Sequence, residues 1–157
     1  MRVASIHEIK QELASFKAAE LVGICLRLGR FKKENKELLT YLLFEAHDEG
    51  AYIQNIKNEI DELFAEINTT HIYFAKKSLR KILRIANKHI RYSGSKQIEV
   101  EVLLHFCIQL KQSGLAKERN TVINKLYHVQ LKKVKKTVDA LHEDLQYEYQ
   151  KSIEALA

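Results

Sequence analysis

Glu101 and His105 come nearest, in residue type and spacing, to the components of a chemical site. On a helix, residues four apart lie one turn apart on the same side. Such a pair suits acid–base chemistry or a metal ligand set. A carboxylate-bridged metal site in a helical bundle needs Glu-x-x-His pairs, however, and none occurs in the sequence. We therefore expect Glu101 and His105 to form a polar edge hydrogen-bonded to a neighbouring helix, and we predict no metal site and no cofactor.

Other groups of polar residues have the residue types of a chemical site but not the spacing that such a site needs. Asp139 and His142 share a helix face, but they do not have the Glu-x-x-His pattern of a bundle metal site either. His105 and Cys107 suggest an activated thiol, yet side chains two residues apart on a helix point about 160° apart. There is no glycine-rich phosphate loop and no nucleophile elbow. We predict no catalytic residue, and an enzyme would need a concave pocket around His105. A solvated helix end explains the last group, Glu45, His47, Asp48 and Glu49.

Helices must position these residues, because apolar side chains recur at three- and four-residue steps almost throughout the chain. The sequence contains no proline and only five glycines among 157 residues, and no stretch shows sustained strand-like alternation. Residues 95–112 are apolar on nearly every side, which is typical of a buried helix. Glutamates and a histidine interrupt this segment too often for a membrane span. It is therefore expected to be the central helix of a single all-α domain covering residues 1–157.

About seven helices are expected, either as an irregular bundle or as a short α-solenoid-like stack. A shift of 44 residues aligns the apolar positions of residues 51–67 with those of the central helix, as repeated helix pairs of a stack would, although generic amphipathic helices align in the same way. Ser5 and Glu8 are expected to form a capping box at the start of the first helix. Gly29 is expected to end the second helix, and Gly23 within it is expected to mark a close contact with another helix. Further helices are expected over residues 33–48, with Leu42 and Leu43 facing inward, and over residues 71–92. A long last helix is expected within residues 117–157, and it either bends or projects to pair with another chain.

The two cysteines, Cys25 and Cys107, lie on apolar helix faces. Without metal-type spacing, both are expected to be buried free thiols. The first residues lack the apolar core of a signal peptide. We therefore expect a cytoplasmic protein with no membrane partner.

Basic residues are concentrated in one part of the chain, although the formal net charge is only +6. Residues 70–136 hold 16 Lys and Arg but 3 Asp and Glu. Like charges one turn apart destabilise a helix, so an anionic neighbour is expected, either an acidic surface of the same protein or an anionic partner. One basic set lies opposite the apolar stripe of helix 71–92, which has no acidic residue: Lys77, Arg80, Lys81, Arg84, Lys88 and Arg91. A second set follows in the last helix: Lys132, Lys133, Lys135 and Lys136.

Two functions follow from these patterns. The leading hypothesis is a non-enzymatic helical interaction module that binds another protein or itself, with a homodimer formed through the last helix. The alternative is nucleic-acid binding, in which the basic face of helix 71–92 contacts the phosphate backbone. The mixture of Arg and Lys suits phosphate contact. No aromatic residues are interleaved with the basic ones, which argues against base stacking on a single strand.

Overall fold

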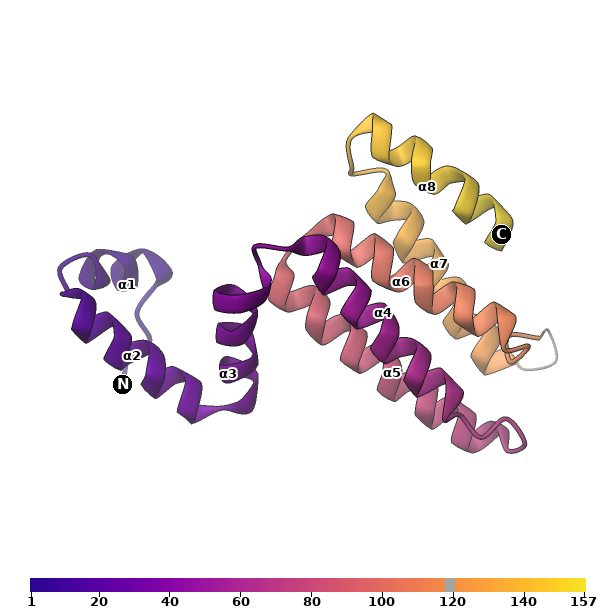
Figure 1. The fold of residues 1–157 in the computed structure, drawn as a ribbon, viewed down its shortest axis with the longest axis horizontal. Coiled ribbons are helices and arrows are strands. Elements are labelled where there is room, and N and C mark those ends of the chain that lie inside the picture. The colour runs from indigo at the N-terminus through magenta and orange to yellow at the C-terminus, as the bar shows by residue number, and fades with distance from the viewer. Residues whose placement is uncertain (118–120) are drawn as a thin grey trace. The chain divides into compact units, whose positions relative to one another are not determined.

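The protein is all-α, as predicted, in a computed structural model that describes residues 1–117 and 121–157. Eight α-helices occur within these residues rather than about seven (Figure 1). Contacts between residues divide the chain into two units, residues 1–44 (unit 1) and residues 45–157 (unit 2), and each is described by itself. The expectation that all 157 residues form one domain stays a prediction.

Unit 2 is built around α6 (Lys96–Gln112), as the sequence predicted. The side chain of Ser95 caps the helix by accepting a hydrogen bond from the backbone N–H of Ile98. Just before it, Gly94 has a φ of +63°, a left-handed conformation that suits glycine and ends the preceding helix. Burial extends around most of the circumference of α6: Ile98, Val100, Val102, Leu103, Leu104, Phe106, Cys107 and Leu110 are all buried.

Helix pairs stack side by side in unit 2. Helix α4 runs parallel to α6, because Glu49 contacts Ser95 near their first turns and Asp61 contacts His105 farther along. The last helix also runs parallel to α6, since Lys111 reaches the carbonyl of Ala155 near the ends of both. The chain returns between these helices through α5 and α7 (Figure 1). This order is that of a short α-solenoid-like stack. The other helices of unit 2 are α4 (Glu49–Ala65), α5 (Ile72–Ser93), α7 (Thr121–Val138) and α8 (Glu143–Leu156).

The single long helix predicted within residues 117–157 is wrong. Helix α7 ends at Val138, and α8 begins at Glu143 after a turn. Gln146 stabilises this turn by donating hydrogen bonds to the backbone carbonyls of Asp139 and Leu141. The turn allows α8 to fold back, so that its residues Tyr149, Ile153 and Leu156 are buried. The last helix therefore does not project, and it offers no apolar stripe for a homodimer.

Unit 1 contains α1 (Ile6–Leu13), α2 (Ala18–Phe31) and α3 (Lys33–Thr40). The capping box at α1 is confirmed: the Ser5 hydroxyl accepts from the Glu8 N–H, and the Ser5 N–H donates to the Glu8 carboxylate. The expected end of the second helix is wrong, because α2 runs on through Gly29 to Phe31. Gly29 instead allows the close approach of α3 to α2, because a Cβ at this position would lie 3.0 Å from the side chain of Leu39.

The helix predicted over residues 33–48 is also wrong in its second half. The α-helix ends at Thr40 and is followed by a π-helix, η1 (Tyr41–Glu45). Leu42 and Leu43 are exposed rather than inward. Asp48 begins the next helix by accepting a hydrogen bond from the N–H of Ala51, so α4 starts before Gly50.

Within the described residues, no helix is both long enough and apolar enough to cross a membrane.

Candidate functional site

The basic residues of α5 lie on one outward face of unit 2. Apolar side chains anchor the opposite side of the helix, where Ala75, Leu79, Ala86 and Ile90 are buried in the core. Because 3.6 residues make one turn, this stripe forces the intervening cations toward solvent. Five of them are exposed, and Lys88 is half-buried. We call these six residues the α5 basic face: Lys77, Arg80, Lys81, Arg84, Lys88 and Arg91.

The five exposed cations of this face are not neutralised by acidic residues of the described protein. Among the residues that the structure describes, the five exposed cations make no ion pair, and α5 contains no acidic side chain. Two carboxylates of α4 have partners of their own instead. Glu59 accepts a bond from His89 at 3.1 Å, and Asp61 accepts one from His105 at 2.6 Å.

A concavity lies at the first half of the α5 basic face. Its volume is about 510 Å³, and side chains of α5 line it. Tyr73 is one of them, and its side chain is exposed. The tyrosine lies four residues before Lys77 and seven before Arg80, so it shares their face of the helix. Sequence reasoning missed it, although this spacing could have found it. The other lining residues are Lys76, Lys77, Ser78, Arg80, Lys81 and Arg84.

The second basic set, in α7, does not form one face. The ammonium of Lys133 lies 3.0 Å from the carboxylate of Glu99 and 3.5 Å from the side-chain oxygen of Asn87. Lys132, Lys135 and Lys136 are exposed. Lys133 and Lys135 point about 160° apart, because two residues advance a helix by about 200°. This set is therefore divided between Lys133, which forms an ion pair inside unit 2, and the other three lysines, which share one exposed side of α7.

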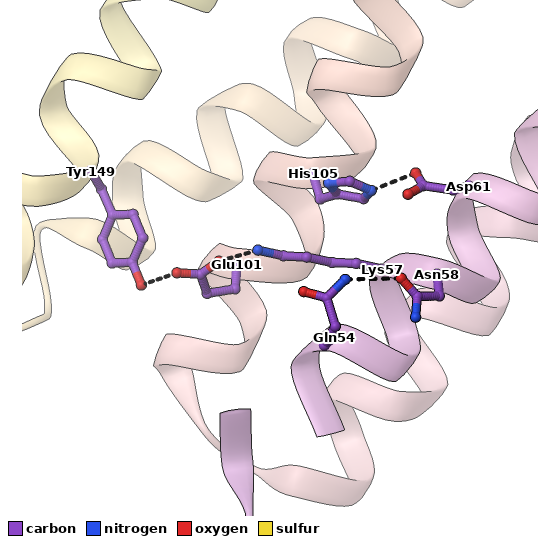
Figure 2. A network of polar contacts seen from close by, with 7 residues as sticks. All are labelled: Gln54, Lys57, Asn58, Asp61, Glu101, His105 and Tyr149. Atoms are coloured by element: carbon purple, nitrogen blue, oxygen red, sulfur yellow. Dashed lines mark hydrogen bonds and ion pairs between the residues drawn. The ribbon is translucent and has the colours of Figure 1, made fainter. Parts of the chain in front are cut away.

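Glu101 is the centre of a polar network that joins three parallel helices (Figure 2). Its carboxylate accepts a hydrogen bond at 2.5 Å from Lys57 of α4 and another at 2.6 Å from the hydroxyl of Tyr149 of α8. Burial favours the neutral acid, but the bonds from Lys57 and Tyr149 outweigh it and lower the pKa of Glu101. Burial and the neighbouring carboxylate together raise the pKa of Tyr149. The predicted polar edge of α6 is therefore present, and it holds helices together.

His105 lies one turn farther along the same edge. Its Nε2 atom is 2.6 Å from an oxygen of Asp61 of α4 (Figure 2). Both side chains belong to the layer formed by α4, α6 and α8. The cysteine two residues away, Cys107, is fully buried, and burial raises the pKa of its thiol to about 12. Burial therefore disfavours the thiolate form of Cys107.

A second chain of polar contacts links α4 to α5, and sequence reasoning missed it. The buried hydroxyl of Tyr52 lies 3.0 Å from Nδ1 of His89, whose Nε2 lies 3.1 Å from the carboxylate of Glu59. His89 is 37 positions from Tyr52 and 30 positions from Glu59 in the chain, so no local spacing signals these contacts. Because the tyrosine hydroxyl is enclosed, this arrangement serves to fix α5 against α4.

The remaining polar groups act as helix ends. His142 caps α8 by accepting from the N–H of Asp144, and Asp48 caps α4. Glu49 accepts a bond from the hydroxyl of Ser95. Among the described residues, no three His, Cys, Asp or Glu side chains gather as metal ligands would.

Unit 1 presents an apolar surface instead of a core. None of residues 1–44 is buried, although its helices are amphipathic. Cys25 is exposed, so its predicted burial is wrong, whereas that of Cys107 is confirmed. Within residues 1–44, all of which are described, no element buries these apolar side chains. Its large exposed apolar side chains are Val3, Ile6, Ile9, Val22, Leu26, Leu28, Phe31, Leu42, Leu43 and Phe44.

A scan against protein-family models and searches of curated proteins and of solved structures find no match to this chain.

Proposed function

We propose that the protein is a helical interaction module that self-associates through the apolar surface of unit 1. The observation that supports this function is the lack of any buried side chain among residues 1–44, together with large exposed apolar side chains on their helices. A stable soluble monomer rarely leaves so many apolar residues in water. Such a surface is typical of a protein–protein contact.

The size of unit 1 supports the same proposal. Forty-four residues lie near the lower limit at which a chain can enclose a core of its own. Segments of this size are usually stabilised by disulfides, metals or association with another chain. The one cysteine of unit 1, Cys25, is a free thiol. No disulfide therefore stabilises unit 1, which supports association as the way in which these helices gain apolar burial.

A second copy of this chain is the partner that we propose. A two-fold dimer needs one surface that is complementary to itself, and an apolar face meets this requirement because its contacts have no direction. Unit 1 also holds both signs of charge, 8 Lys and Arg with 5 Asp and Glu, so that its rim can pair with its own copy. The homodimer expected through the last helix is replaced by one through unit 1, because α8 is folded back.

Two valines provide a matched test. Val22 in α2 and Val129 in α7 have exposed fractions of 58% and 53%, and both lie on helices. We expect the full chain to be dimeric at micromolar concentration in sedimentation velocity. Val22→Glu should shift the equilibrium toward monomer by at least about tenfold, because a carboxylate cannot be desolvated in an apolar interface. Val129→Glu should leave it unchanged.

Circular dichroism of both variants checks that each helix is retained. A wild-type chain that stays monomeric at several hundred micromolar would show that self-association is wrong. An equal effect of both substitutions would show that the contact does not involve unit 1.

A further inference from the structure

We propose that the α5 basic face is a binding site for single-stranded nucleic acid. Its cations contact successive phosphates, and Tyr73 stacks on a base at one end. This site lies in unit 2 and is independent of self-association through unit 1.

The first argument is the state of the charges. Lys77, Arg80, Lys81, Arg84 and Arg91 are exposed and make no ion pair among the described residues. Two acidic side chains of the neighbouring α4, Glu59 and Asp61, bond to histidines and not to these cations. Repulsion between cations one turn apart is thus not relieved within the described protein. An anionic ligand would relieve it.

The second argument is the shape of the charge distribution. From Lys77 to Arg91 the cations follow one another at most four residues apart, with Arg80 and Lys81 adjacent, and the whole row is about 21 Å long on the helix axis. A single phosphate group is held by cations that converge on one point. A straight row instead matches a linear polyanion, in which charged groups follow one another along a backbone. Arginine adds two-pronged contacts to phosphate oxygens.

The third argument distinguishes a single strand from a duplex. Tyr73 lines the same concavity as Lys77, Arg80 and Arg84, and about 70% of its surface is exposed. The neighbouring ring of Phe74 meets it edge to face with 5.5 Å between centroids, which steadies the tyrosine ring. An aromatic ring beside a cationic groove is the arrangement that stacks unpaired bases without sequence preference. A duplex keeps its bases stacked on each other and offers none to Tyr73.

Binding of the full chain to a fluorescent 20-nucleotide thymidine oligomer, followed by anisotropy, tests the proposal. We expect affinity to fall about 50-fold between 50 and 200 mM salt, as it does when about four phosphates are contacted on a single strand. The same sequence as a duplex should bind more weakly at every salt concentration.

Two pairs of lysines give a charge-matched control. Lys77 and Lys81 lie one turn apart on α5, and Lys132 and Lys136 lie one turn apart on α7; all four are exposed. Lys77→Glu/Lys81→Glu should reduce affinity at least about 20-fold and flatten the salt dependence. Lys132→Glu/Lys136→Glu makes the same change in net charge and should reduce affinity less than about threefold. Equal losses in both variants would show attraction by net charge alone and overturn the site.

Tyr73→Ala should weaken binding by about fivefold or more with an unchanged salt dependence, and Tyr73→Phe should restore it, because stacking needs the ring alone. An unaffected Tyr73→Ala variant, or equal affinity for the duplex, would overturn the single-strand assignment. Binding to phosphatidylserine vesicles or to polyglutamate without binding to the oligomer would assign the face to a membrane or an acidic protein and overturn the proposal. Thermal unfolding of each variant confirms that the fold is kept.

Discussion

Asp61 and His105 face each other across two parallel helices, with 2.6 Å between Oδ1 and Nε2, and they are 44 residues apart in the chain. Lys57 and Glu101 have the same separation and the same relationship. This spacing equals the shift that aligned the apolar residues of α4 with those of α6 in the sequence. Polar residues at equivalent positions of two stacked helices therefore bond to each other, and the outer edge of the layer becomes a ladder of contacts.

The Glu101 contacts predict a specific dependence of stability on pH. The pKa of its carboxyl is lowered from its ordinary value of 4.5 in the folded protein, so the ionised form stabilises the fold above that value. This contribution is lost as the pH falls through the folded pKa. We expect Glu101→Gln to lower the free energy of unfolding by about 1–2 kcal/mol at pH 7.

Urea unfolding between pH 7 and pH 3 measures this difference. The wild type and Glu101→Gln should converge as the pH falls from 4.5 through the lowered pKa of the folded Glu101 carboxyl, because the wild-type carboxyl then becomes neutral. A difference that is constant over the whole range would mean that packing, and not the charge, stabilises the fold at this position.

The two cysteines should differ strongly in reactivity. Cys25 is exposed, whereas Cys107 is fully buried and burial raises the pKa of its thiol to about 12. Only the thiolate reacts with disulfide reagents, so Cys107 should stay protected in the native protein. We expect dithionitrobenzoate at pH 8 to label one thiol per chain rapidly and the second only after denaturation, and Cys25→Ser to remove the rapid phase alone.

The apolar patterns predicted which residues share a face, but not whether another element covers that face. The central helix could be recognised because its apolar residues include Val102, Leu103 and Leu104, which follow one another at 100° steps and so point to different sides of the helix. Leu42 and Leu43 have equally regular spacing and are exposed. The difference depends on what packs against each helix, and this is a property of the whole fold.

The break between α7 and α8 could not be predicted, because no glycine or proline marks it. Contacts distant in sequence determine it instead: the hydroxyl of Tyr127 donates a 2.6 Å bond to the carbonyl of Leu156 once α8 has folded back. At the candidate site, the row of cations was visible in the sequence. The contributions of His89 and Tyr73 were missed, since one depends on tertiary contacts and the other on exposure.

Two glycines of α2 should respond in different ways to the same substitution. A Cβ on Gly23 would meet no atom within 4 Å, whereas one on Gly29 would lie 3.0 Å from Leu39. Gly23→Ala should therefore stabilise the protein by about 1 kcal/mol through helix propensity. Gly29→Ala should gain less or be destabilising, because Leu39 must move. The melting temperatures of the two variants compare them directly, and an equal gain in both would show that α3 does not approach α2 closely.

Removal of a large side chain from α6 should destabilise unit 2 severely. Phe106 is fully buried, and its ring lies 5.5 Å from that of Phe64 of α4. Phe106→Ala should lower the free energy of unfolding by about 3–5 kcal/mol, since it loses apolar burial and leaves a cavity. Val129→Ala, at an exposed position, should change it by less than about 0.5 kcal/mol. Denaturant unfolding measures both, and a loss below 1 kcal/mol for Phe106→Ala would contradict the central position of α6.

The α5 basic face should limit the stability of the free protein. Lys81 lies one turn from Lys77 and from Arg84, and all three are exposed. Each repulsive pair costs a few tenths of a kcal/mol, and reversing one charge turns both pairs into attractive ones. Lys81→Glu should therefore raise the free energy of unfolding by about 0.5–1 kcal/mol at low salt, and the gain should shrink in 0.5 M salt, where exposed charges are screened. Chemical denaturation at the two salt concentrations measures this gain. A substitution that stabilises the free protein while it weakens oligonucleotide binding would indicate that the row of like charges is retained for its ligand. A loss of stability would instead mean that Lys81 makes a favourable contact in the folded protein.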